Sequence, residues 1–190
     1  MSEQTCSACG TRVAPYDGVL LSAKKVARFL CSRCYNETVA EYLGLDYEHV
    51  AFDPVILEDR DGIPHTFQFR SRVFSDRLSL EALETGQDEG YEFSVIADAE
   101  QDLFATFRGL FERIRRELGR KHIEPEGDGY QITDAGVVCG QITSDPDALD
   151  RMPLLVIDGK PVTWEELGRM VSPYEGFNFK LQIFDRSEER

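Results

Sequence analysis

Two short stretches decide the architecture of the N-terminal part of the chain: Cys-Ser-Ala-Cys-Gly at residues 6–10 and Cys-Ser-Arg-Cys at residues 31–34. Two thiolates three positions apart in a tight turn point at one ion, and two such pairs complete a tetrahedral shell of four sulfurs around Zn2+. We therefore predict one structural zinc ion per chain, held by Cys6, Cys9, Cys31 and Cys34.

Two other kinds of cysteine site compete with zinc. A redox-active dithiol needs the strand–motif–helix context of a βαβ unit, and the first pair has no such context. A rubredoxin-like iron site has two matched cysteine turns, and a glycine follows each of them. Here Gly10 follows the first pair but Tyr35 follows the second, which favours zinc.

The second cysteine pair is expected at the start of a helix. Residues 32–44 predict a short helix, with Ser32 as its N-cap and Gly44 at its C-terminal end. Apolar residues 19–21 and 27–30 predict a hairpin before this helix. A cysteine turn, a hairpin and a helix that carries the second pair form the treble-clef plan.

Residues 5–45 resemble the treble-clef zinc-binding domain of the ClpX unfoldase, which has a similar arrangement of C-x-x-C-G and C-x-x-C. The chain contains no G-x-x-x-x-G-K-[ST] motif, so the resemblance implies a zinc module without the ATPase. Segments such as Pro-Leu-Leu-Val-Ile-Asp-Gly at 153–159 and Asp-Gly-Ile-Pro-His at 61–65 resemble a family of uncharacterised bacterial proteins. That resemblance implies a bacterial, cytosolic, zinc-binding protein.

We predict an α+β fold with two domains: a treble-clef-like zinc module at residues 1–45 and an acidic domain at residues 46–190. The second domain is expected to contain an antiparallel sheet, because residues 66–74, 91–97 and 177–183 alternate between apolar and polar side chains. One long helix is expected at 99–121. A short helix begins with a capping box at 163–166.

The composition excludes several classes of partner. The chain has 190 residues, with 21 Lys and Arg against 35 Asp and Glu, which gives a net charge of −14. This balance opposes binding to nucleic acid backbones and to anionic lipid. No apolar run reaches the roughly 18–20 residues of a membrane span, and the first residues lack a signal-peptide pattern. We therefore expect a cytoplasmic protein with no membrane contact.

The remaining candidate residues have ordinary structural explanations. Cys139 lies in an apolar stretch and is expected to be a small buried side chain. His65 follows a hairpin turn and is expected to be a surface or edge residue. A basic cluster in the zinc module offsets the charge of the four thiolates or, alternatively, contacts nucleic acid: Lys24, Lys25, Arg28 and Arg33.

The absence of catalytic motifs favours a zinc-binding adaptor or regulatory protein that acts through protein–protein interaction. An enzyme with an unrecognised site around Asp61 and His65, or a nucleic-acid-associated regulator, is the alternative. A homodimer or packing against the rest of the chain must cover the apolar residues of the zinc module, because the module is too small to hide them. The sequence of residues 67–74 weakly resembles that of residues 177–184, either through duplication or through convergence.

Overall fold

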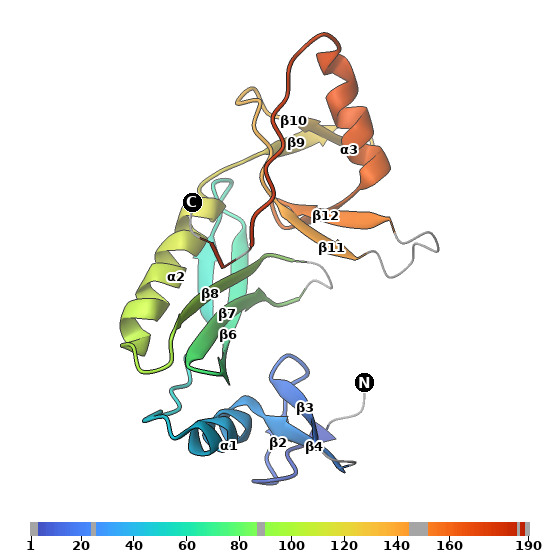
Figure 1. Cartoon of the computed structure of the whole chain (residues 1–190). Coiled ribbons are helices and arrows are strands. Elements are labelled where there is room, and N and C mark those ends of the chain that lie inside the picture. Colours follow the sequence, from blue (N-terminus) through green and yellow to red (C-terminus); the bar gives the residue numbers. More distant parts are fainter. Residues whose placement is uncertain (1–3, 24–25, 87–89, 145–151, 186, 189–190) are drawn as a thin grey trace. The chain divides into compact units, whose positions relative to one another are not determined.

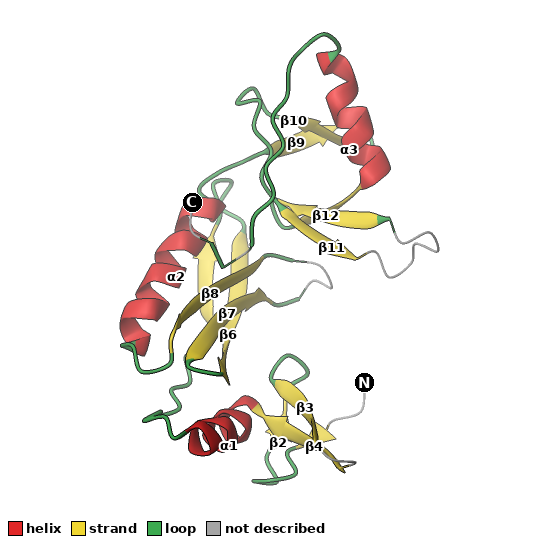
Figure 2. Cartoon of the chain, in the orientation of Figure 1, coloured by secondary structure: helices red, strands yellow, loops and turns green. Residues whose placement is uncertain are grey.

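A computed structural model describes residues 4–23, 26–86, 90–144, 152–185 and 187–188 (Figures 1 and 2). Within these residues the protein is α+β, as the sequence predicts, with three α-helices and several antiparallel sheets. The helices are α1 (Ser32–Leu43), α2 (Leu103–Leu118) and α3 (Trp164–Val171), and one turn of 3-10 helix, η1 (Ser172–Tyr174), follows α3.

Thirteen strands form five sheets within the described residues. The central sheet has the order β5-β6-β7-β8, a three-stranded sheet has the order β11-β12-β13, and the others are the pairs β1-β2, β3-β4 and β9-β10. The strands are β1 (Gln4–Thr5), β2 (Arg12–Val13), β3 (Gly18–Ala23), β4 (Val26–Cys31), β5 (Val55–Glu58), β6 (Pro64–Phe74), β7 (Arg77–Glu84), β8 (Glu92–Asp98), β9 (Ile123–Glu126), β10 (Gly129–Ile132), β11 (Gln141–Ser144), β12 (Pro153–Ile157) and β13 (Lys160–Thr163).

The chain forms two compact units, each built from segments that are distant in sequence. The first comprises Met1–Pro54, Gln68–Ala82 and Ser94–Phe111, and the second comprises Val55–Phe67, Leu83–Phe93 and Glu112–Arg190. The cysteine turn, the β3–β4 hairpin and α1 belong to the first unit, together with segments of β6, β7, β8 and α2.

The N-terminal module has the predicted treble-clef order of cysteine turn, hairpin and helix. Gly44 ends α1 in the left-handed conformation (φ 70°), as expected of a glycine there. The N-cap, however, is Cys31 rather than the predicted Ser32. The Asp17 carboxylate accepts a bond from the Ser32 N–H, and the Ser32 hydroxyl donates to the Asp17 carbonyl. Asp17, which is distant in sequence, therefore provides hydrogen-bond partners at the start of the helix, where we had expected Ser32 to act as the N-cap.

Helix α1 is joined to strand β6 by a buried asparagine in the first unit. The Asn36 side chain, which has no solvent exposure, donates to the Ser71 carbonyl (2.9 Å) and accepts from the Val73 N–H (2.9 Å). From the other face of β6, the Arg70 guanidinium donates to the Tyr16 carbonyl (2.7 Å). The polar face of this strand therefore contacts the cysteine module.

Aromatic rings form part of the core of the first unit. Phe107 of α2 stacks on Phe52 (4.1 Å between ring centroids) and lies edge-on to Phe69 of β6. The helix is shorter than the predicted 99–121. The Asp98 and Asp102 carboxylates accept bonds from N–H groups two residues ahead, which delays the helix start to Leu103.

In the second unit a small core lies between α3 and the strands β9 to β13. The predicted capping box begins α3: the Thr163 hydroxyl accepts from the Glu166 N–H and the Glu166 carboxylate accepts from the Thr163 N–H. The β12–β13 turn is Asp158-Gly159 with positive φ at both residues (50° and 67°), which is the pattern of a type I′ hairpin.

The strands differ from the sequence prediction in two places. The alternating segment 177–183 is not a strand, because no neighbouring strand within the described residues pairs with it. Strand β7 was missed although Leu78, Leu80 and Ala82 alternate there, and their side chains are buried.

Replacing Asn36 with Ala is expected to lower the free energy of unfolding by about 2–4 kcal/mol, because it leaves a buried N–H on Val73 and a buried carbonyl on Ser71 without their partner. Urea denaturation of the full chain measures the change. Glu41→Ala, at an exposed position of the same helix, is the control and should change stability by less than about 0.5 kcal/mol. Equal effects of the two substitutions would contradict this role of Asn36.

Candidate metal centre and a buried histidine cluster

The four cysteines of the two C-x-x-C pairs converge in the folded module. The sulfur atoms of Cys6, Cys9, Cys31 and Cys34 all lie within 4.8 Å of one another. Cys6 and Cys9 come from the turn between β1 and β2, Cys31 ends β4, and Cys34 lies in the first turn of α1. The turn that carries the first pair is joined to β4, which ends at Cys31, because the Ser7 N–H donates to the Phe29 carbonyl (2.7 Å).

The arrangement of sulfur atoms fits a tetrahedral metal ion. Four sulfurs at about 2.3 Å from an ion lie about 3.8 Å from one another. The Cys9 and Cys31 Sγ atoms are 3.9 Å apart. Thiolate ligands select soft or borderline ions such as Zn2+ or iron over Mg2+ or Ca2+. The four cysteines are therefore arranged to bind a metal ion.

Local hydrogen-bond donors favour thiolates on the first cysteine pair. Burial raises the pKa of Cys6, but N–H groups of Cys9, Cys31 and Ala8 outweigh it and lower the pKa to about 6. The Thr11 hydroxyl, 3.4 Å from the Cys9 Sγ, is the main cause of a lowered pKa at Cys9. Burial raises the pKa of Cys31 and of Cys34. A cation at the centre would allow these last two to ionise with the others.

The other candidate residues differ in their contacts and in their exposure to solvent. Arg33, between the ligands Cys31 and Cys34, forms an ion pair with Glu37 (2.8 Å). Arg28 is exposed on β4, whereas Lys24 and Lys25 lie outside the described residues. Cys139 is partly buried in a loop before β11 and belongs to the second unit, whereas the four clustered cysteines belong to the first.

The expectation that His65 lies at the surface is wrong. His65 is 7% exposed, because it shares the buried face of β6 with Phe67, Phe69 and Val73. Its Nδ1 is 2.6 Å from the Glu84 carboxylate, and its Nε2 is 3.4 Å from the Asp59 carboxylate. The period of two along β6 would have identified this burial from the sequence.

Further contacts fix both carboxylates beside His65. Glu84 also accepts from the Tyr91 N–H (2.9 Å), and the Tyr91 ring lies edge-on to the imidazole (5.4 Å between centroids). Asp59 accepts bonds from the N–H groups of Asp61 and Ile63 in the β5–β6 turn. Burial and the charges of Asp158, Glu84 and Asp59 raise the pKa of Tyr91, so its phenol stays neutral.

Asp61, the other residue suggested for an enzymatic site, does not join this cluster. Its carboxylate forms an ion pair with Lys121 at the end of α2. The imidazole of His65 is instead held on both sides by carboxylates and is covered by Tyr91. The cluster fixes the β5–β6 turn against β7 and offers a substrate little access to its ring nitrogens.

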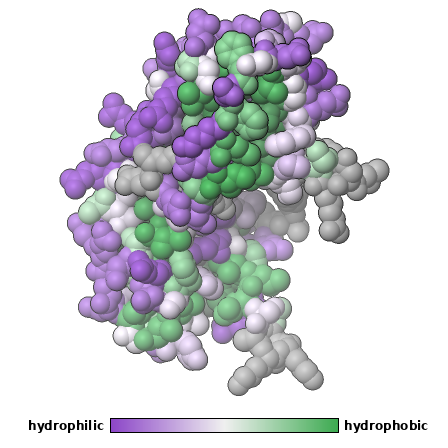
Figure 3. All heavy atoms as spheres, turned by 45° about the horizontal axis from the view of Figure 1, so that its top comes forward, coloured by the Kyte–Doolittle hydropathy of each residue, from purple (hydrophilic) through white to green (hydrophobic). Residues whose placement is uncertain are grey.

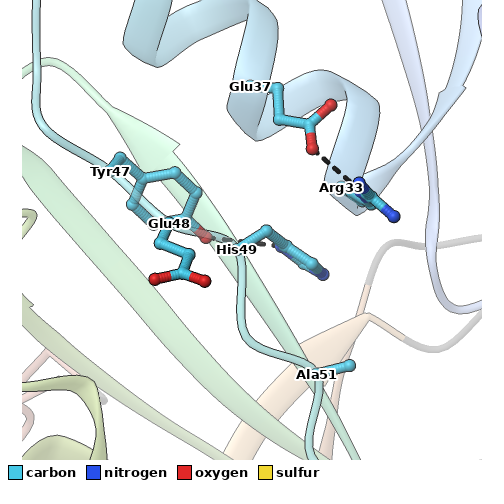
Figure 4. Close-up of a pocket in the computed structure, with 6 residues that line it drawn as sticks. All are labelled: Arg33, Glu37, Tyr47, Glu48, His49 and Ala51. Carbon is cyan, nitrogen blue, oxygen red and sulfur yellow. Dashed lines mark hydrogen bonds and ion pairs between the residues drawn. The ribbon is translucent and has the colours of Figure 1, made fainter.

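A cavity of about 510 Å3 lies beside α1 and the segment that follows it (Figure 4). Arg33 and Glu37 on one side of it are paired with each other, and the Tyr47 hydroxyl lies 3.4 Å from the His49 Nδ1. Burial lowers the pKa of His49, with Arg33 adding to this effect. The cavity therefore contains polar groups that already interact with one another.

Three protein-family models match consecutive parts of the chain, and all three are described as domains of unknown function. Residues 5–46 match Domain of unknown function (DUF7685), residues 48–119 match Domain of unknown function (DUF7686), and residues 120–188 match Domain of unknown function (DUF7713). No curated protein and no solved structure gave a significant match. Among the described residues, every helix is too short or too polar to cross a bilayer.

Asp59→Asn is expected to lower the free energy of unfolding at pH 7 by about 1–2 kcal/mol, because the amide keeps the turn but loses the charge facing His65. Burial alone would raise the pKa of Asp59, but bonds from Ile63, His65 and Asp61 hold it below its ordinary 3.8. The stabilisation is therefore complete above that value and is lost as the pH falls through the folded-state pKa.

Urea denaturation between pH 7 and pH 3 measures this difference. The gap between the natural chain and Asp59→Asn should narrow steadily below about pH 4. Asp59→Ala, which also removes the acceptor for the two N–H groups of the turn, should cost more than Asp59→Asn at every pH. A gap that is independent of pH would contradict the role assigned to the charge.

Proposed function

We propose that this protein is a zinc-binding adaptor or regulatory protein, in which Cys6, Cys9, Cys31 and Cys34 hold one structural Zn2+ and the folded surfaces serve protein–protein interaction. The observation that carries the proposal is the convergence of the four sulfur atoms within 4.8 Å. Four protein ligands close a tetrahedral shell, so that no position is left for a substrate or a water molecule. A closed shell favours a structural role for the ion.

Zinc is the ion that best explains the small core of this module. The buried residues of the cluster are Cys6, Val13, Leu30 and Cys34, so that two of its four members are ligands. A core of this size provides little stability by hydrophobic burial alone. Metal binding supplies folding free energy to such modules directly, as it does in zinc fingers.

Exposed apolar side chains of the module support a role in binding proteins. Leu30 is fully buried, but Tyr42 is 88% exposed and Leu20 is 68% exposed. Leu43 also remains exposed at the end of α1. Large apolar side chains on the surface of a small module are typical of contact sites. We propose that they contact a protein partner.

An enzymatic role has less support. The only histidine cluster suggested by sequence, around His65, is buried between two carboxylates.

A nucleic-acid role has less support too, because Arg33 is engaged by Glu37 and the net charge is −14. A mobility-shift assay at about 50 mM salt, where electrostatic contacts are strong, should show no binding.

Purified full-length protein should contain about one zinc ion per chain by elemental analysis, since four thiolates form one closed site. Cys34→Ser should lose most of this metal, whereas Cys139→Ser should retain it, because Cys139 lies in the other unit. Native protein without metal, in which all four thiols of the pairs react with an alkylating reagent, would refute the proposal.

We also propose that residues 1–45 form a folding module separate from 46–190. Removal of the metal by a chelator should then unfold the module alone, because the metal contributes much of its folding free energy. Limited proteolysis of the metal-free chain should cut within the first 45 residues and leave the rest intact. Cleavage throughout the chain would show instead that the two parts unfold together.

A further inference from the structure

The segment 177–184 exposes an unusual amount of apolar surface. It follows η1 and runs as an extended stretch toward the C-terminus (Figure 1). Phe177, Phe179, Leu181 and Ile183 are between 70% and 90% exposed. Figure 3 shows that apolar side chains gather in places on the face of the molecule that it presents. Apolar side chains so arranged mark an interaction site.

The sequence of this segment matches a strand of the same protein. Residues 177–184 read Phe-Asn-Phe-Lys-Leu-Gln-Ile-Phe, and residues 67–74 of β6 read Phe-Gln-Phe-Arg-Ser-Arg-Val-Phe. In β6 the counterparts of the exposed side chains, Phe67, Phe69 and Val73, are 8% exposed or less. The alternating apolar side chains are thus buried in a core in β6, whereas those at 177–184 are exposed.

The backbone of residues 178–183 is available for pairing. Within the described part of the chain, no hydrogen bond involves residues 178–183. A stretch of alternating side chains with unpaired N–H and carbonyl groups is a template for strand addition. It lacks only a second strand.

We propose that residues 177–184 pair with the same residues of a second copy of this chain, as an antiparallel strand pair with its two-fold axis at Leu181. Residues directly opposite in an antiparallel pair project to the same face. With Leu181 opposite its own counterpart, Phe179 lies opposite Ile183 of the second copy. The apolar side chains of both copies therefore share one face.

Charge selects both the second copy and this register. The segment contains no acidic residue, so that two copies of a chain with net charge −14 can approach here without opposing carboxylates. The competing register of equal length, with Lys180 at the axis, sets two ammonium groups opposite each other. The register at Leu181 instead sets Lys180 opposite Gln182, and a symmetric contact of this kind is self-complementary.

This inference deepens the proposed function, because it names a second copy as a partner, and it rests on a surface separate from the metal centre. Light scattering and sedimentation of the full-length protein should give twice the chain mass of 21.6 kDa at micromolar concentration. Leu181→Lys should weaken the dimer at least tenfold, because it places two ammonium groups at the axis. Metal content should not change.

Matched variants locate the contact. Val137→Lys alters a similarly exposed apolar residue of the same unit, and Tyr42→Lys alters the exposed face of the metal module. Both should remain dimeric. A chain that is monomeric at every concentration, or a Leu181→Lys variant that stays dimeric, would overturn the proposal. If Tyr42→Lys alone becomes monomeric, the metal module is the dimer contact instead.

Cross-linking tests the register in a Cys139→Ser background. Leu181→Cys should cross-link rapidly to its counterpart with a short bismaleimide, since directly opposite Cβ atoms lie about 5 Å apart. Phe177→Cys is equally exposed, but its counterpart lies eight residues along the pair, about 27 Å away, and should not react. Equal rates for the two variants would refute the register.

Discussion

The convergence of four thiol groups is the constraint on which the N-terminal module depends. Four sulfurs within 4.8 Å of one another repel as thiolates unless a cation lies between them. Two of the ligands, Cys6 and Cys34, are also members of the small buried core. The candidate metal site and the hydrophobic packing therefore share residues in this module, and the β3–β4 hairpin and α1 are arranged around the four cysteines.

Polar contacts join the module to the sheet. The Asn36 side chain bonds to the backbone of β6 on both sides of Arg72, and Arg70 bonds to the Tyr16 carbonyl. Such bonds are directional, so they fix the orientation of α1 on the strand. Because Asn36 lies two residues after Cys34, a single turn of α1 carries both the cysteine and the contact with β6.

The second unit contains a different solution to burying polar groups. His65, Asp59 and Glu84 lie together at one end of the β5–β6 hairpin, and each is engaged by another member or by backbone N–H groups. Buried charges are tolerated when they are paired and hydrogen-bonded in this way. An Asp-Gly pair also forms the two-residue β12–β13 turn, where the Asp158 carboxylate accepts from the N–H groups of His122 and Ile123.

The amino-acid sequence by itself determined the cysteine site, the order of turn, hairpin and helix, the α+β class and the capping box of α3, because each depends on residues close in the chain. Only the tertiary structure decided which carboxylates lie beside His65 and that Asp17 caps α1. It also left 177–183 without a strand partner. The physical reason is that these features depend on groups brought together from distant positions. An alternating pattern states that a segment can form a strand, but the available edge, in this chain or in another copy, decides whether it does.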